Sequence, residues 1–157
     1  MTPLAQTPFL SLVVPTRNRP QLFRRAILSI LNQTFTNIEI IAVVDGATND
    51  DLLEYQKLEK KFRTALTFIF LPHRENGHGP SFARNTGINV SKGLYIGFLD
   101  DDDEWTCNEH LARFYKSYEK SNAKLDIYFS NQRALKTNGD EVNGPVWIED
   151  VIKKQIA

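Results

Sequence analysis

The residues best suited to chemistry form an acidic run at Asp100–Asp103, directly after the apolar segment 94–99. Two carboxylates ~4 Å apart repel by about 1 kcal/mol in water and by ~4 kcal/mol at an effective dielectric of about 20. In an extended segment, Asp100 and Asp102 would point to the same side, ~6–7 Å apart, and Asp101 to the other. A hard divalent ion such as Mg²⁺ or Mn²⁺ prefers such oxygen ligands and removes the repulsion. The run therefore predicts a metal-assisted diphosphate site, with the ion shared between one or two carboxylates and substrate phosphates.

Two other interpretations of the acidic run remain open. Asp103 and Glu104 precede a helix-like pattern around Leu111, and acidic residues stabilise helix N-termini, so these two favour a solvated turn. An Asp-x-Asp after a strand also fits the haloacid-dehalogenase phosphatases. In that family the motif follows the first strand and continues with Thr or Val, whereas here it follows a fourth apolar run and continues as Asp103-Glu104-Trp105.

The elements around the run alternate between apolar strands and amphipathic helices. This alternation, in steps of roughly 25–30 residues, predicts βαβ units and an α/β fold with a mostly parallel sheet. A turn is expected at Asn138-Gly139 and a short last helix over residues 148–156. Strands are expected at residues 9–14, 38–44, 66–71, 94–99 and 127–130, and helices at 22–31, 52–62, 81–90 and 111–118.

Ligands of open parallel sheets bind beyond the carboxyl ends of the strands, near a switch in strand order. Besides the acidic run, the polar residues expected there are Thr16, Asn18, Asp45 and the loop after Leu71.

Length and composition restrict the class of protein. The chain has 157 residues, about one domain, and its 19 basic and 19 acidic residues balance, which argues against a nucleic-acid binder. Cys107 is the single cysteine, so an internal disulfide or a zinc ribbon is excluded. No apolar run approaches the ~18–20 residues of a membrane span, and residues 1–8 lack the features of a signal peptide. We expect a cytoplasmic domain with a flexible segment 1–8, associated with a membrane only through partners or further segments.

Five segments between about residue 9 and residue 131 resemble the family-2 glycosyltransferases, which have the GT-A fold. They occur in the family's order and near its spacing. The resemblance implies a Rossmann-like, mostly parallel sheet with helices on both faces, and a single domain over residues 1–157 that forms the nucleotide-sugar-binding half of a GT-A domain, truncated before the acceptor-binding part. The segments are residues 11–20 (SLVVPTRNRP), 28–35 (LSILNQTF), 40–48 (IIAVVDGAT), 83–88 (ARNTGI) and 92–105 (KGLYIGFLDDDDEW).

The resemblance also implies roles for single residues. Asp102 would bind the metal, Mn²⁺ or Mg²⁺, and Asp100 would face the ribose or the water shell of the metal. Asp45 would accept a hydrogen bond from the base edge, the segment 15–18 would line the base pocket, and Arg84 would place a positive group near the nucleotide. The implied nucleotide-binding residues are Pro15, Thr16, Asn18, Asp45, Arg84, Asp100 and Asp101, and the implied metal-binding residues are Asp102 and Asp100.

The sequence departs from the family pattern in three places. Val44 replaces the first of two aspartates that usually precede the glycine at position 46, and Arg17 stands where many members have an aromatic residue. Glu149-Asp150 matches the family's acceptor-facing acidic pair in letters only, because it comes too early and is typical of a helix start. The catalytic base is therefore expected beyond Ala157.

The implied function is the inverting, metal-dependent transfer of a sugar from a nucleotide diphosphate sugar to an acceptor hydroxyl. A UDP-sugar is the expected donor, with GDP and dTDP as alternatives, and the acceptor would be a glycan or a lipid-linked glycan, as in polysaccharide biosynthesis. This chain alone would bind the donor and transfer little or nothing. A non-catalytic nucleotide-sugar-binding module or degenerate transferase, and a metal-dependent phosphatase, are the alternatives. An apolar face left exposed would favour homodimers.

Overall fold

A computed structural model describes residues 7–130, 132–136 and 139–142 of the chain. The chain forms two compact units, residues 1–113 and residues 114–157. The sheet and the acidic run both belong to the first unit.

Four parallel strands form the sheet of the first unit, in the order β3-β2-β1-β4. They are β1 (Leu10–Thr16), β2 (Ile38–Val44), β3 (Leu66–Phe70) and β4 (Tyr95–Phe98). All seven residues of β1 are buried, as expected for a central strand that is covered on both faces. The α/β fold and its parallel sheet, predicted from the alternation of elements, are confirmed.

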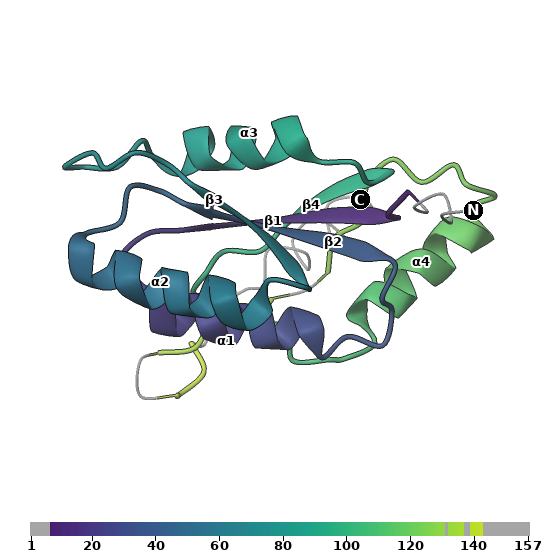
Figure 1. The fold of residues 1–157 in the computed structure, drawn as a ribbon. Helices are drawn as coiled ribbons and strands as arrows, with labels where there is room; N and C mark the ends of the chain where they lie inside the picture. The colour runs from purple at the N-terminus through teal and green to yellow at the C-terminus, as the bar shows by residue number, and fades with distance from the viewer. Residues whose placement is uncertain (1–6, 131, 137–138, 143–157) are drawn as a thin grey trace. The chain divides into compact units, whose positions relative to one another are not determined.

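Helices cover both faces of this sheet (Figure 1). The helices α1 (Pro20–Leu31) and α2 (Asn49–Phe62) lie on one face, and α3 (Pro80–Val90) lies on the other. Right-handed crossovers explain this arrangement. The chain moves in one direction from β1 to β3, which places α1 and α2 on the same face, and it then returns past β1 to β4, which places α3 on the opposite face. The helix α4 (His110–Lys120) follows the acidic run.

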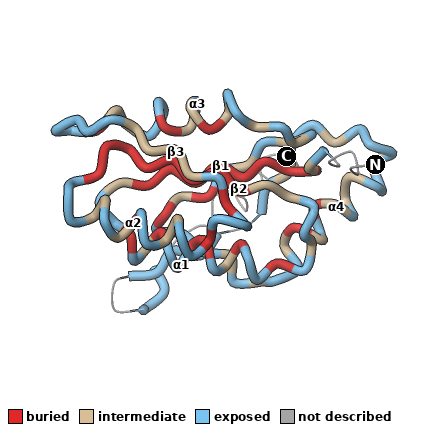
Figure 2. The backbone as a smooth tube through the Cα atoms, in the orientation of Figure 1, coloured by how far each residue is buried: buried red, intermediate tan, exposed pale blue. Residues whose placement is uncertain are grey.

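The core lies against the strands, as the buried positions of Figure 2 show. On the α1 face, the ring of Phe23 is 5.7 Å from that of Tyr55 and 5.8 Å from that of Phe68. On the α3 face, Val13 packs with Ala83. A Cβ atom at position 87 would lie 2.4 Å from the Val13 Cγ1 atom, so Gly87 allows α3 to lie close to β1.

The second unit differs from expectation. The predicted strand over residues 127–130 is wrong, because these residues adopt no strand conformation and no strand of the described chain pairs with them. The side chains of Ile127 and Phe129 are 72% and 59% exposed. The short apolar run also lacks a neighbouring strand that would satisfy the hydrogen bonds of its backbone. An antiparallel bridge joins Leu135 to Glu141 on either side of the expected turn. Asn138, the predicted helix 148–156 and Glu149-Asp150 lie outside the described residues.

Among the described residues, no helix combines the length and apolar character that a membrane crossing requires.

Candidate functional site

The candidate site lies where the strand order switches. β1 is flanked by β2 on one side and by β4 on the other, so the crossover connections diverge from β1, which is the position where ligands bind in such sheets. Thr16 is the last residue of β1, Asp45 follows β2, and Asp100 comes two residues after β4. Because the strands are parallel, these residues share one edge of the sheet.

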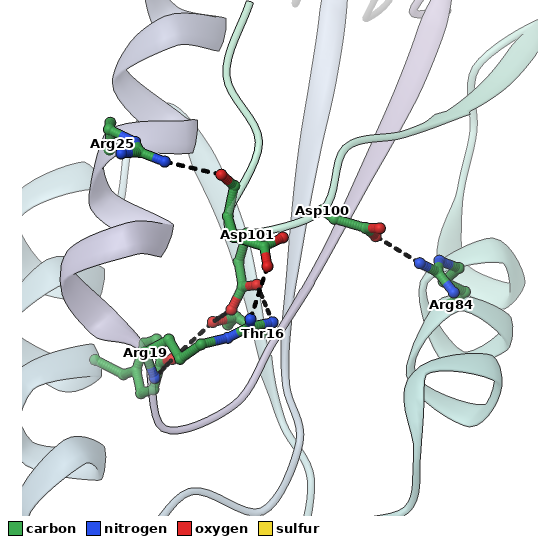
Figure 3. A network of polar contacts seen from close by, with 8 residues as sticks. Thr16, Arg19, Arg25, Arg84, Asp100 and Asp101 are labelled. Atoms are coloured by element: carbon green, nitrogen blue, oxygen red, sulfur yellow. Dashed lines mark hydrogen bonds and ion pairs between the residues drawn. The ribbon is translucent and has the colours of Figure 1, made fainter. Parts of the chain in front are cut away.

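Asp101 points into the protein at this edge (Figure 3). It is only 1% exposed. Its Oδ2 atom accepts a hydrogen bond of 2.7 Å from the Thr16 hydroxyl, and its Oδ1 atom accepts one from Arg19 Nη2 at 2.5 Å. Burial raises the pKa of Asp101 above its usual value, although Thr16 and Arg19 both act to lower it. Asp101 and Thr16, both expected at the nucleotide, thus have side chains that face each other in the interior.

Asp101 is part of a closed ring of hydrogen bonds. Thr16 donates its hydroxyl proton to Asp101, so its oxygen accepts from the Tyr55 hydroxyl at 2.6 Å. The Tyr55 oxygen in turn accepts from the backbone N–H of Arg19 at 3.0 Å, and the Arg19 side chain returns to Asp101. Burial raises the pKa of Tyr55 and so keeps its proton in place. The ring joins the end of β1, the start of α1, the helix α2 and the acidic run.

Asp100 and Asp102 diverge from this buried position toward two different arginines. The Asp100 carboxylate pairs with Arg84 Nη2 of α3 at 2.5 Å (Figure 3). The Asp102 carboxylate pairs with Arg19 Nη1 at 2.8 Å, and its backbone carbonyl accepts from Arg25 Nη2 of α1 at 2.8 Å. Both carboxylate side chains are about half exposed, at 47% and 48%.

The acidic run is a turn and not an extended segment. The backbone N–H of Asp103 donates to the Asp100 carbonyl at 3.1 Å. The expectation that Asp100 and Asp102 point to one side is therefore wrong, because it assumed an extended segment. An i to i+3 hydrogen bond of this kind bends the chain, and each aspartate finds a different partner.

Asp45 is held by the residues that open α3. Its carboxylate accepts the backbone N–H groups of His78 at 2.8 Å and Gly79 at 2.9 Å, and also the His78 Nδ1–H at 2.8 Å. Burial by itself would raise the pKa of Asp45, but these donors outweigh it and hold the pKa below its usual value. Asp45 is therefore an ionised, oriented carboxylate at the carboxyl end of β2.

Two residues of the predicted base pocket fix the loops around Asp45. Arg17 Nη2 donates to the carbonyls of Arg74 and Glu75 at 3.1 and 2.7 Å, and its buried Nε atom has no hydrogen-bond partner among the described residues. Asn18, in a left-handed conformation with φ of 53°, accepts from the Thr48 backbone N–H at 2.9 Å. The pocket segment therefore stabilises the loops that follow β2 and β3.

Gly77 is required where the loop after β3 passes over Asp45. Its φ is +68°, and a Cβ atom there would lie 2.7 Å from Asp45 Oδ2. A side chain at this position would both strain the backbone and displace the carboxylate.

Asp45→Asn is expected to lower the free energy of unfolding at neutral pH by about 1–3 kcal/mol, since an amide cannot accept all three N–H donors. The pKa of Asp45 is lower in the folded than in the unfolded chain. Its contribution is therefore complete above the unfolded value near 3.8 and is lost as the pH falls through the folded pKa. Urea unfolding between about pH 3 and pH 7 measures the difference from wild type, which shrinks in acid. Asp50→Asn, at an exposed aspartate, is the control, and an equal pH-dependent loss there would contradict the prediction.

The carboxylates present suit a divalent ion shared with phosphate. The described residues contain no group of three or more His, Cys, Asp or Glu side chains arranged to hold a metal, so they offer no all-protein cage. They do offer Asp100 and Asp102, two half-exposed carboxylates whose charges are already balanced by arginines. One or two carboxylates, completed by phosphate oxygens and water, is the usual way in which Mg²⁺ is held in phosphate-handling sites.

Sequence reasoning missed three residues of this site. Arg19 and Tyr55 complete the ring around Asp101, and His78 binds Asp45. Tyr55 is fully buried, although it lies on a helix whose composition is that of a solvated surface. The position of Arg19 directly before the helix-initiating Pro20 was the available signal, because such a residue lies at a strand-to-helix junction.

Comparison with known proteins identifies the family. The sequence profile described as "Glycosyl transferase family 2" matches residues 11–154. The colanic acid biosynthesis glycosyl transferase WcaA of Escherichia coli, whose name is qualified as putative, is 38% identical over 105 residues, which are 67% of this chain and 36% of that protein. A Campylobacter jejuni protein named "GalNAc(5)-diNAcBac-PP-undecaprenol beta-1,3-glucosyltransferase" is 38% identical over 97 residues, which are 62% of this chain and 30% of that protein. The chain thus spans about a third of the length of these two relatives.

Solved structures agree on the fold. Residues 1–349 of Staphylococcus aureus TarS align with a TM-score of 0.64 and 23% identity, over 86% of this chain and 38% of that one. The mannosyltransferase PcManGT of Pyrobaculum calidifontis, solved with GDP-Man and Mn²⁺, aligns with a TM-score of 0.61 and 21% identity, over 73% of this chain and 33% of that one. The profile match over most of the chain, together with the shared fold, places this chain in glycosyl transferase family 2.

Proposed function

We propose that this chain is the donor-binding part of an inverting glycosyltransferase, which binds a nucleotide diphosphate sugar together with Mn²⁺ or Mg²⁺. The observation that carries the proposal is the arrangement at the strand-order switch, where two half-exposed carboxylates after β4 lie at the same sheet edge as the ionised, oriented Asp45 after β2. Family membership supports the proposal. Two structural neighbours support it as well, because TarS was solved with UDP-GlcNAc and with UDP, and PcManGT with GDP-Man and Mn²⁺.

Each residue has a role that suits its chemistry. Asp45, held ionised by His78 and Gly79, would accept a ring N–H of the base. Asp102 and Asp100 would hold the metal beside the diphosphate. Arg84, now paired with Asp100, carries a planar fork of N–H donors that suits ribose or phosphate oxygens.

The transfer itself would need more than these residues provide. When bound, the metal would neutralise the negative charge that grows on the nucleoside diphosphate as the glycosidic bond breaks. In an inverting reaction, a carboxylate removes the proton of the acceptor hydroxyl. Asp45, Asp100, Asp101 and Asp102 are already committed to binding and positioning, so we place the base outside the part of the chain described here. We propose a glycan or lipid-linked glycan as the acceptor.

The proposal is tested by calorimetric titration of the chain with UDP, GDP and dTDP, each with Mn²⁺ and each with EDTA. We expect one nucleotide to bind more tightly in Mn²⁺ than in EDTA. At a nucleotide concentration of ~100 times the Kd, binding should raise the free energy of unfolding by about 2.7 kcal/mol. The absence of binding by all three nucleotides in Mn²⁺ would contradict the proposal. Release of phosphate from p-nitrophenyl phosphate, without nucleotide binding, would instead identify a phosphatase.

A further inference from the structure

Arg19 holds two aspartates of the acidic run at once. Its Nη2 atom is 2.5 Å from Asp101 Oδ1, and its Nη1 atom is 2.8 Å from Asp102 Oδ2. The two carboxylates differ in environment, because Asp101 is 1% exposed and Asp102 is 48% exposed. One guanidinium therefore joins an interior carboxylate to the outer carboxylate that is proposed to bind the metal.

The attachment of Arg19 to the interior does not depend on Asp102. Its backbone N–H donates to the Tyr55 hydroxyl at 3.0 Å, and Pro20 begins α1 immediately after it. Asp101, which Nη2 contacts, is fixed in turn by Thr16 at 2.7 Å. Loss of the Nη1 contact would leave each of these interactions in place.

The contact between Arg19 Nη1 and Asp102 Oδ2 can be replaced by another cation. The Arg19 and Asp102 side chains are both about half exposed, and solvent screening makes ion pairs of this kind weak. A divalent ion at Asp102 Oδ2 and the permanently charged guanidinium, which lies 2.8 Å from that oxygen, would repel each other. Metal binding and the Nη1 contact therefore compete at this atom.

We propose that Arg19 is a positioning residue that competes with the metal. In the metal-free protein it neutralises Asp102, and it gives that oxygen up when the metal binds while it stays attached to Asp101. This inference rests on the proposed function, because it assumes a metal at Asp102. It gives the acidic run a counter-charge in both states, so that the turn keeps its shape before the donor arrives.

The test compares Mn²⁺ binding and stability in Arg19→Gln. We expect the Kd for Mn²⁺ alone, measured from the electron paramagnetic resonance signal of free Mn²⁺, to fall about two- to fivefold, since a competitor worth up to ~1 kcal/mol is removed. In EDTA, the melting temperature should fall by about 4–8 °C, because Asp101 loses its counter-ion. If Arg19 had a merely structural role, its replacement would weaken metal binding and also lower stability. Competition instead predicts tighter metal binding together with lower stability.

Arg19→Lys keeps the measurement interpretable if Arg19→Gln fails to fold. A lysine supplies a charge for Asp101 but has no planar fork with which to bridge two carboxylates, so Mn²⁺ binding should again tighten with a smaller loss of stability. Arg25→Gln is the matched control. It removes the same charge from a side chain that contacts the backbone carbonyl of Asp102 and the carboxylate of Glu104 but forms no ion pair with the Asp102 carboxylate in the described part of the chain. Its Kd should stay within about twofold of wild type.

The outcomes separate this inference from the proposed function. If wild type binds Mn²⁺ and both Arg19 variants bind it equally or more weakly, competition is overturned while the metal site stands. If Arg25→Gln tightens binding as much as the Arg19 variants do, general electrostatics explains the effect and the inference is again overturned. If neither wild type nor any variant binds Mn²⁺, the proposed metal site itself fails, and the inference fails with it.

Discussion

Asp102→Asn is expected to abolish the gain in nucleotide affinity that Mn²⁺ provides. Asparagine preserves the size of the side chain but replaces a charged oxygen by a neutral one, and hard divalent ions depend on carboxylate ligands. Losing such a ligand should cost at least about tenfold in Kd for the nucleotide in Mn²⁺, since even outer-shell changes cost about 10–100-fold in metal affinity. Calorimetric titration in Mn²⁺ and in EDTA measures the effect, and the Kd in EDTA should remain close to that of wild type.

Asp103→Asn is the matched control for this experiment. It removes one negative charge from the neighbouring residue, an exposed aspartate whose backbone N–H, but not its carboxylate, forms the turn. We expect the difference between Mn²⁺ and EDTA to survive in Asp103→Asn. An equal loss in both variants would mean that the charge of the run, and not a ligand at position 102, explains the metal dependence.

Thr16→Val is expected to give a large loss of stability. Valine has the shape of threonine, so packing is retained, but the hydroxyl that joins Asp101 to Tyr55 disappears. Thr16 is 3% exposed and Asp101 is 1% exposed, so water cannot replace the lost bond. A buried group left without a partner costs about 1–3 kcal/mol, and more if it is charged, so we expect a loss of about 2–4 kcal/mol in the free energy of unfolding.

Urea unfolding at neutral pH measures this loss, and Tyr55→Phe is the control. Removing the tyrosine hydroxyl leaves the bond from Thr16 to Asp101 intact and deprives only neutral groups of a partner, so it should cost about 1–2 kcal/mol. A loss in Tyr55→Phe as large as that in Thr16→Val would contradict the idea that the buried charge dominates the ring.

The sequence predicted the scaffold of the site well, because that information is local. Strands such as residues 10–16 and 38–44 are mostly apolar and rich in branched side chains, and the helices between them carry a periodic apolar stripe. Parallel order and the edge at which Asp45 and the acidic run lie follow from the alternation of elements. The strand expected at 127–130 failed because an apolar run becomes a strand only if a neighbouring strand pairs with it.

The directions in which the aspartate side chains point could not be predicted from the local sequence. The alternation of side chains in an extended chain predicts that Asp100 and Asp102 point the same way, but the hydrogen bond from the Asp103 N–H to the Asp100 carbonyl makes this segment a turn. As a result, Asp100 faces an arginine of α3 and Asp102 faces the residue that precedes α1.

The sequence by itself thus determined the α/β class, the positions of the four strands, and the presence of acidic and polar residues at their carboxyl ends. Only the tertiary structure decided that Asp101 is buried, that Arg19 bridges Asp101 and Asp102, and that Tyr55 and His78 complete the site. Arg19 lies 83 residues from Asp102 and 36 from Tyr55 along the chain. Hydrogen bonds between such distant residues leave no periodic trace in the sequence, because they form only when the packing of the sheet and its helices brings the partners together.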